Sequence, residues 1–359
     1  MRRSLVSKVS LRDFRCFSNL ELEFHPESTC IIGKNASGKT SLLEAVSVLA
    51  RLQSPRSNSL IQLIRHGAKG LVTDGFVRGY HLQFYYSATR RKIALDGVEQ
   101  KSTGAYLDVA KLVYLANSDI ALIRGPGETR RRFLDFVGGQ LFTNYREILR
   151  SYEKALHSRN RYLKMIPPRP REVNAYSKPL LQFGRQLTML RADLIKRLEP
   201  HLTESFGAVS DRNEQLALLF QAGATGDFEK ALSESAVEES RVNVTVVGPH
   251  RDDFKLRLND KPADLFASEG QQRTIAIALK LAEAKVLELE FSNPPLLLLD
   301  DVFGELDTTR RNRLFSALPS RGQRIITSTH LDWLDSLPAG KVYHIQENDT
   351  GERMMQPVA

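Results

Sequence analysis

The sequence has little cysteine and no long apolar run. Its 359 residues include two cysteines, Cys16 and Cys30, which lie beside apolar residues and show no metal-ligand spacing. This scarcity argues against a disulfide-stabilised fold and favours a reducing compartment. No apolar stretch approaches the ~20 residues that span a bilayer, and no apolar signal-peptide segment follows the charged start. We therefore expect a cytoplasmic protein with no membrane partner.

Sustained heptads, internal repeats and low-complexity tracts are also lacking, which disfavours a coiled-coil arm. Hydrophobic residues make up 42% of the chain and charged residues 26%, as in ordinary globular proteins. A chain of this length is expected to form two domains.

The net charge of +9 is concentrated in one part of the chain. Residues 120–200 hold 17 Lys+Arg and 7 Asp+Glu, a net of +10, which leaves about −1 for the rest. A localised basic surface indicates a polyanionic partner such as nucleic acid. The alternative is a solvated basic helical surface that has no dedicated ligand.

Residues 33–40 read Gly-Lys-Asn-Ala-Ser-Gly-Lys-Thr and fit the P-loop pattern G-x-x-x-x-G-K-T. In such a loop backbone N–H groups cradle phosphates, the lysine reaches the β and γ phosphates, and the hydroxyl binds Mg²⁺. An apolar strand precedes the loop and an apolar helical stripe follows it, as the pattern requires. The candidate ATP-binding residues here are Gly33, Lys34, Asn35, Ala36, Ser37, Gly38, Lys39, Thr40 and Ser41.

Four leucines followed by Asp300 and Asp301 predict a Walker B strand. A parallel strand buried on both faces is continuously apolar, and its acids emerge at the carboxyl end, where ligands bind. We expect Asp300, with Thr40, to hold Mg²⁺ and Asp301 to polarise the attacking water. Upstream, Ser268, Gly270 and Gln271 open a long amphipathic helix, whose N-terminus offers a second anion site.

The periodicity predicts an α/β protein with a helical insertion. Residues 1–118 and 242–359 are expected to form one discontinuous α/β domain, and residues 119–241 a basic helical domain. Alternation over residues 71–95 predicts an antiparallel meander. Further strands are expected at residues 109–115, 242–247, 324–329 and 341–345, and helices at 40–50, 128–136, 144–165, 173–198 (ending before Pro200), 227–239 and 268–289.

The order of these motifs resembles ABC-type ATPases. The S-x-G-Q element at Ser268 looks like their signature sequence, residues 304–307 look like their D-loop, and His330 looks like their switch histidine. The resemblance implies an ABC-type ATPase head, with a P-loop α/β core and an antiparallel β subdomain. It also implies that two copies pair head to tail around ATP, with His330 at the γ-phosphate and Asp307 at the interface. His330, Lys39 and Asp301 are then the catalytic candidates.

The glutamine of the Q-loop of that class is absent. The corresponding region reads Tyr-Leu-Ala-Asn-Ser-Asp over residues 114–119. Asn117 and Asp119 are the two candidates to replace the glutamine, and the sequence does not choose between them.

Longer runs are similar to the bacterial RecF family, which is SMC-related. They are residues 11–17, 122–135, 158–163, 248–253, 267–280 and 300–307, spread over nearly the whole chain. The resemblance implies a weak, DNA-dependent ATPase of recombinational repair, associated with the nucleoid and the SOS response. Its partners would be duplex DNA at gaps and single-strand/double-strand junctions, a second copy in the presence of ATP, RecO and RecR, and RecA indirectly.

Arginines of the basic segment are candidates for phosphate contacts, since arginine suits bidentate phosphate recognition. They are Arg130, Arg131, Arg132, Arg159, Arg161, Arg169 and Arg171. For each of them an internal ion pair is the alternative; Arg130 and Arg132, for example, could pair with Asp135 or Glu128.

Two other functions share some of these motifs. An SMC-type tethering head is disfavoured by the lack of coiled coil. A transporter nucleotide-binding subunit is disfavoured by the separation of about 230 residues between Thr40 and Ser268, and by the basic insertion.

Overall fold

The computed structural model describes residues 5–57, 59–166, 169–210, 214–304, 306–319, 321–329, 340–348 and 352–358. Clustering of backbone contacts divides the chain into two compact units, which we describe separately. Unit 1 comprises Met1–Ser118 and Glu283–Ala359, and unit 2 comprises Asp119–Ala282.

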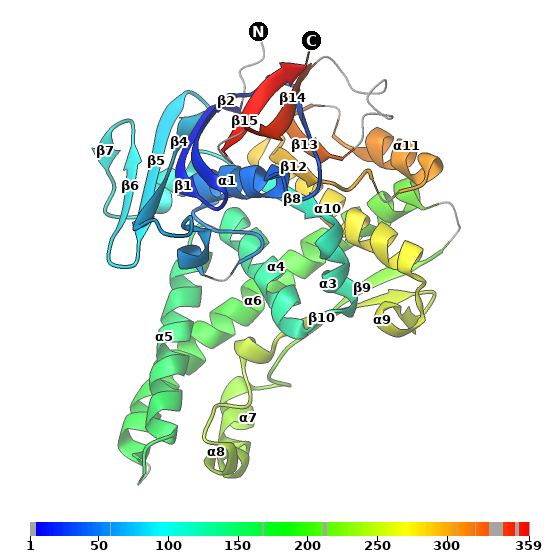
Figure 1. Ribbon diagram of the computed structural model, residues 1–359. Helices are drawn as coiled ribbons and strands as arrows, with labels where there is room; N and C mark the ends of the chain where they lie inside the picture. The colour runs from blue at the N-terminus through cyan, green and yellow to red at the C-terminus, as the bar shows by residue number, and fades with distance from the viewer. Residues whose placement is uncertain are drawn as a thin grey trace. The chain divides into compact units, whose positions relative to one another are not determined.

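Unit 1 contains an antiparallel sheet in the order β2-β1-β4-β5-β6-β7 (Figure 1). Its strands are β1 Val6–Phe14, β2 Phe17–Glu23, β4 Gly70–Val77, β5 Tyr80–Ser87, β6 Arg91–Leu95 and β7 Val98–Glu99. Along β4 every second residue is buried, the pattern of a sheet with one face toward the core. The predicted meander over residues 71–95 is confirmed.

The second sheet of unit 1 is largely parallel and has the order β15-β14-β3-β13-β12-β8. Its strands are β3 Ser28–Ile32, β8 Leu112–Ala116, β12 Leu296–Asp300, β13 Arg324–Ser328, β14 Gly340–Glu347 and β15 Arg353–Val358. Strands β3, β13, β12 and β8 are buried at every residue, which explains their continuous apolar sequences. Asp300 pairs with Thr327 on one side and Ala116 on the other, so three carboxyl ends meet at one edge.

The helices of unit 1 are short or deeply buried. They are α1 Lys39–Arg51, η1 Leu60–Leu63, α2 Gly104–Asp108 and α11 Thr308–Ala317, whereas η2 Asn117–Ile120 and α10 Glu269–Phe291 cross the division between the units. Helix α1 is buried along almost its whole length, because it packs between strands of both sheets.

Unit 2 is mainly helical. Its elements are α3 Ala121–Arg124, α4 Gly127–Leu141, α5 Tyr145–Leu163, α6 Pro170–Val209, β9 Leu216–Gln221, α7 Phe228–Glu234, α8 Ala236–Val242, η3 Pro249–Arg251, β10 Asp253–Leu258, β11 Lys261–Pro262 and α9 Ala263–Phe266. Helices α5 and α6 lie side by side (Figure 1). Tyr145, Tyr152, Leu180 and Leu187 belong to the buried core that joins them.

Two expectations about secondary structure are wrong in detail. Helix α6 continues through Pro200 to Val209, because its buried stripe of Leu198, Leu202 and Phe206 continues past an exposed proline. Residues 242–247 form no strand, since the N–H of Thr245 donates to Asn160 Oδ1 (2.8 Å) instead of to a ladder.

The compact units divide after Ser118 and after Ala282, whereas the domains expected from the sequence divide after residues 118 and 241. Residues after 242 remain in unit 2 because strand β10 pairs antiparallel with β9, from Asp253↔Gln221 to Leu258↔Leu216. Neither strand is among those expected from the sequence.

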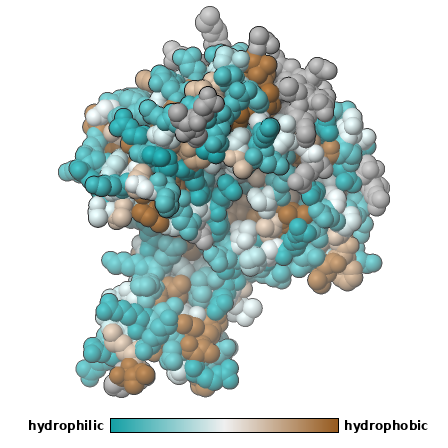
Figure 2. Space-filling model, viewed as in Figure 1, coloured by the Kyte–Doolittle hydropathy of each residue, from teal (hydrophilic) through white to brown (hydrophobic). Residues whose placement is uncertain are grey.

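The face shown in Figure 2 is mainly hydrophilic, with apolar side chains in small separate groups. Among the described residues, no helix combines the length and the apolar character that crossing a membrane requires.

Candidate nucleotide-binding site

The P-loop connects buried strand β3 to helix α1. Ala36 and Gly38 have positive φ values of 64° and 113°, so the loop curls and its N–H groups turn inward. At Gly38 a Cβ atom would lie 2.8 Å from Cys16 Sγ, and at Gly33 it would lie 2.5 Å from Ile345 Cγ2. Packing therefore requires glycine at both positions, and at Gly38 the positive φ requires it as well.

Two side chains of the loop, Lys39 and Ser37, fit an anionic ligand. Lys39 Nζ donates to the carbonyls of Gly33 (2.6 Å) and Lys34 (2.9 Å), and burial lowers its pKa while Asp301 and Asp300 oppose that shift. Ser37 Oγ is buried and has no hydrogen-bond partner among the described residues. A buried hydroxyl without a partner is costly in a folded protein, and a phosphate oxygen would satisfy it. Lys34, Asn35 and Ala36 are exposed.

Asp300 is 7% exposed and is surrounded by hydroxyl groups. Its Oδ1 accepts from Thr40 Oγ1 (3.0 Å) and Thr327 Oγ1 (2.8 Å), and its Oδ2 accepts from Tyr114 Oη (2.7 Å). The carboxylate and the Thr40 hydroxyl are adjacent hard oxygen donors, which is the ligand chemistry that Mg²⁺ prefers. These residues therefore fit the predicted magnesium site.

Asp301 begins a tight turn after β12, with a φ of 55°. Its N–H donates to Thr327 Oγ1 (3.0 Å), and its carbonyl accepts from Asn117 Nδ2 (3.0 Å). Asn117 thus contacts the acidic turn directly. A Cβ on Gly304 would lie 3.3 Å from Asp301 Oδ1, so a glycine keeps the space beside the carboxylate open.

Tyr114 and Thr327 also belong to this site and were not predicted from the sequence. Both lie on strands that neighbour β12, and Thr327 pairs directly with Asp300. The sequence signal for Thr327 was that β13, the strand after β12, ends in polar residues. No local pattern marks Tyr114, since it reads as one more core residue of a strand.

The predicted signature element begins helix α10 in unit 2. Ser268 N donates to Gln271 Oε1 (2.7 Å) and Gln271 N donates to Ser268 Oγ (3.3 Å), which is a reciprocal capping box. Gln271 Nε2 also donates to Glu214 Oε1 (2.6 Å). The N-cap prediction for Ser268 is confirmed, and Gly270 lies in the first turn of the helix.

Asp307 caps helix α11, with its Oδ1 accepting from Arg310 N (2.9 Å). His330 lies outside the described residues, as does Glu305 of the predicted D-loop.

The candidate arginines fall into two groups. Arg130 and Arg159 are 6% and 5% exposed. Arg130 makes a bidentate ion pair with Asp253 (2.6 and 2.8 Å), and Arg159 makes one with Glu239 (3.0 and 2.6 Å). As phosphate contacts these two predictions are wrong, because a buried guanidinium saturated by a carboxylate does not reach a phosphate.

Arg131 is partly buried and donates to the carbonyl of Asp252 (3.1 Å), whereas Arg132 is partly buried without an ion pair among the described residues. Arg161, Arg169 and Arg171 are exposed, with Arg169 3.7 Å from Glu172. The internal partner of Asp135 is neither Arg130 nor Arg132 but Arg191 (2.8 Å).

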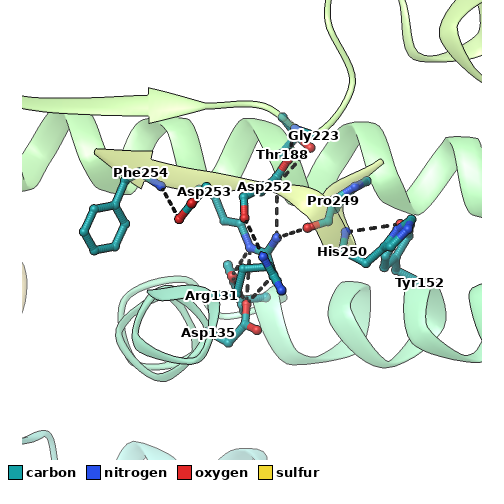
Figure 3. A network of polar contacts seen from close by, with 12 residues as sticks. Arg131, Asp135, Tyr152, Thr188, Gly223, Pro249, His250, Asp252, Asp253 and Phe254 are labelled. Carbon is teal, nitrogen blue, oxygen red and sulfur yellow. Dashed lines mark hydrogen bonds and ion pairs between the residues drawn. The ribbon is translucent and has the colours of Figure 1, made fainter. Parts of the chain in front are cut away.

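Asp135 and Asp252 lie at the centre of a polar network that includes Thr188, Gly223 and Pro249 (Figure 3). Arg191, 2% exposed, donates to both carboxylates and to the Pro249 carbonyl. His250 contacts Tyr152 Oη (2.7 Å) through Nδ1 and the Thr245 carbonyl (2.9 Å) through Nε2. Burial, with smaller contributions from nearby arginines, lowers the pKa of His250 to about 4.

Three features define the class of ABC-type ATPase heads: the P-loop after β3, the acid pair at the end of β12 in the same sheet, and the antiparallel companion sheet. Within this class, the chain belongs to the RecF/RecN/SMC N-terminal domain family, whose sequence model matches residues 5–352.

Several relatives share nearly the full length. The "DNA replication and repair protein RecF" of Lactobacillus gasseri is 33% identical and the match covers 95% of this chain and 97% of the relative. The protein of the same name from Gloeothece citriformis is also 33% identical, over 92% of this chain and 96% of the relative. These matches confirm the RecF resemblance.

Solved structures of related proteins have a similar fold. The recombination mediator protein RecF with ATP, described as part of the RecFOR pathway, has a TM-score of 0.88 and 28% identity, with 99% of this chain and 98% of that chain covered. An Smc head bound to the C-terminal winged-helix domain of ScpA has a TM-score of 0.57 and 14% identity over 99% of this chain and 98% of that chain, which shows a shared fold alone.

Proposed function

We propose that this protein is an ATP-dependent DNA-binding protein of recombinational repair. ATP would bind at Lys39 and pair two copies head to tail on duplex DNA at gaps and strand junctions, and slow, DNA-dependent hydrolysis would release them. With RecO and RecR the protein would promote loading of RecA. The observation that carries the proposal is the Thr40–Asp300 pair beside Lys39, in a chain similar to RecF proteins over 95% of its length.

Each residue of the site has a separate role in ATP binding and hydrolysis in this proposal. Lys39 would leave the loop carbonyls for the phosphates, and Ser37 would donate its hydroxyl to a phosphate oxygen. Thr40 and Asp300 would hold Mg²⁺, which would supply positive charge beside the phosphates. Asp301 orients the attacking water and takes its proton. Asn117 holds the Asp301 turn and takes the place of the missing Q-loop glutamine.

The second half of the site comes from another copy in this proposal. The N-terminus of α10, with Ser268, Gly270 and Gln271, would face the γ-phosphate bound by the first copy, with Asp307 and His330 at the same interface. ATP would bind the paired state much better than the open state, which is the requirement for a switch.

In this proposal the exposed arginines of unit 2 form the DNA-binding surface. Arg161, Arg169 and Arg171, with Arg132 at lower exposure, are the phosphate contacts of the proposal, and they would give affinity without sequence preference.

The proposal is tested by sizing the protein with ATP, with ADP and without nucleotide, each with and without gapped duplex. We expect a dimer with ATP, and a monomer both with ADP and without nucleotide. Lys39→Met should remain monomeric, whereas the control Lys101→Met, at an exposed lysine outside the loop, should behave as wild type. A Lys39→Met protein that still dimerises with ATP would rule out the P-loop assignment.

The head-to-tail arrangement is tested by Ser268→Arg. This variant should bind ATP with normal affinity and stay monomeric, because the added side chain blocks the face offered to the other copy. Mixing it with Lys39→Met should restore no more than one composite site per dimer. Normal dimerisation of Ser268→Arg alone would exclude the arrangement.

A further inference from the structure

Unit 1 has a cleft of about 500 Å³ at the edge of its parallel sheet opposite the P-loop. Glu27, Pro294 and Gln323 line it, and each stands one or two residues before a strand that ends at the nucleotide site, namely β3, β12 and β13. These strands are five residues long, and at ~3.3 Å per residue they separate the two edges by roughly 15 Å. The cleft is therefore distinct from the proposed nucleotide site.

The walls of the cleft are fixed by backbone conformation. Arg78 has a φ of 51°, and its N–H donates to the Leu5 carbonyl (2.7 Å), which ties the tip of the β4–β5 hairpin to the start of β1. Gly322 has a φ of 109°, and a Cβ atom there would lie 3.0 Å from Pro294 Cβ. Glycine thus lets the loop before β13 approach the loop before β12 closely. Both walls hold their shape by contacts within the protein.

The buried amide of Gln323 forms the floor of the cleft. Its Oε1 accepts from Val6 N (2.6 Å), and its Nε2 donates to the carbonyls of Val6 (2.7 Å) and His25 (2.9 Å). Both ends of the amide are occupied by backbone groups. Gln323 therefore joins the segments around the cleft, and recognition of a ligand falls to the other side chains that line it.

The charged side chains of the cleft differ in their surroundings. Burial lowers the pKa of the Arg324 guanidinium and the negative charge of Glu27 opposes that shift, so Glu27 lies close to a cation of its own sheet edge. Arg78 and Arg321 are exposed and have no acidic partner in the part of the chain that the structure describes. Arginine binds carboxylates and phosphates through paired N–H donors. These two guanidinium groups are therefore accessible to an anion from solution.

Apolar surface lies beside these cations in the same cleft. Leu5, Pro26 and Pro294 supply it. An inorganic anion would leave this surface uncovered, whereas an organic anion would cover it and meet the guanidinium groups at once. The volume of the cleft is in the range of pockets that hold small organic ligands (~300–1,000 Å³).

We propose that this cleft binds a small organic anion, with its apolar body against Leu5, Pro26 and Pro294 and its carboxylate or phosphate at Arg78 and Arg321. Such a ligand would contact several segments that are far apart in the sequence, so its binding would stabilise unit 1. The inference goes beyond the proposed function and does not depend on it, since the cleft lies at the other edge of the sheet.

The test uses the full-length protein with and without saturating ATPγS and Mg²⁺. Fluorine NMR follows the binding of para-(trifluoromethyl)benzoate and of para-(trifluoromethyl)phenyl phosphate, and the tighter of the two identifies the preferred anion. The uncharged para-(trifluoromethyl)benzamide should bind at least about tenfold more weakly, because it cannot form charge-assisted hydrogen bonds with the arginines. Equal binding of the amide would overturn the proposal. So would loss of probe binding on addition of ATPγS, which would place the probe in the nucleotide site.

Two substitutions test the cations directly. Arg78→Met and Arg321→Met should each weaken binding of the preferred probe up to about fivefold, as expected for an exposed ion pair, and the double variant should weaken it about tenfold or more. The matched control is Arg90→Met, at an exposed arginine in the turn after β5, which should bind the probe as wild type. Wild-type affinity of the double variant, or an equal loss in the control, would overturn the proposal.

A crystal soak covers the case in which a variant does not fold. Crystals of the wild-type protein are soaked with para-bromobenzoate, and the anomalous signal of bromine locates the probe. We expect bromine in the cleft, with the carboxylate at Arg78 and Arg321. Bromine found only at other places would overturn the proposal. Failure of ATP to bind or to pair two copies would reject the proposed function and leave these results unchanged.

Discussion

Polar groups in the nucleotide site of unit 1 and in the arginine network of unit 2 are satisfied in opposite ways. In unit 1, Ser37 Oγ is buried without a hydrogen-bond partner among the described residues, and Lys39 rests on backbone carbonyls. In unit 2, Arg191 has two carboxylates and a carbonyl around it. The groups of the proposed nucleotide site differ in this respect from the groups that hold the fold of unit 2.

The comparison explains why the family-like runs of unit 2 carry so many charged residues. Arg130 in the run 122–135 pairs with Asp253 in the run 248–253, and Asp252 in the same run pairs with Arg191. Arg159 in the run 158–163 is tied to Glu239 and Thr245. These runs therefore hold distant segments of unit 2 together.

The largest expected effect separates chemistry from binding in unit 1. Asp301→Asn should bind ATP normally and lose about 10²-fold or more in turnover, since a general base contributes on the order of 10²–10⁴. The dimer should persist with ATP, as shown by sizing after prolonged incubation. Unchanged hydrolysis would place the base elsewhere in the chain.

The next effect concerns the stability of unit 2. Arg191→Met leaves the buried Asp252 and the partly buried Asp135 without their cation, and breaking a buried pair costs about 3–5 kcal/mol. The control Arg185→Met removes an exposed arginine that lies near Asp227 and Glu229, which is worth about 0–1 kcal/mol. Urea denaturation measures the free energy of unfolding of both variants. Equal losses for the two variants would contradict the structural role of the network.

Acid should weaken unit 2 through His250. Its pKa in the folded protein, about 4, is below the ordinary value of 6.5, so its contribution to stability is complete above pH 6.5 and falls as pH drops toward 4. Within that window the loss approaches ~1.4 kcal/mol per pH unit. His250→Gln should show a shallower decline of unfolding free energy between pH 6.5 and 4.5. A decline as steep as that of wild type would assign the acid sensitivity to other groups.

The smallest expected effect tests the support of Asp300. Tyr114→Phe removes one of three hydroxyl donors to the carboxylate, and a hydrogen bond to a charged group is worth about 1.5–3 kcal/mol before the remaining donors compensate. We expect a fewfold higher Mg²⁺ requirement for ATP hydrolysis and unchanged nucleotide binding without Mg²⁺. Titration of Mg²⁺ with a fluorescent nucleotide measures both, and Tyr343→Phe, whose hydroxyl donates to the Glu23 carbonyl, is the control.

Much of unit 1 could be predicted because its signals are local. The P-loop pattern, the leucine strand ending in Asp300 and the alternation over residues 71–95 each arise from neighbours in the sequence. The capping box of Ser268 and Gln271 spans only four residues. In contrast, β9 and β10 were missed, since the pairing that makes them strands joins residues 216–221 to residues 253–258.

The sequence by itself determined the class of site, because a phosphate cradle and an acidic strand end need particular residue types at fixed spacing. Only the tertiary structure decided which charged residues face solvent. Arg159 and Arg161 stand two positions apart on one helix, yet the first is buried against Glu239 and the second is exposed. The physical reason is that burial and ion pairing depend on partners about 80 residues away along the chain, as for Arg159 and Glu239.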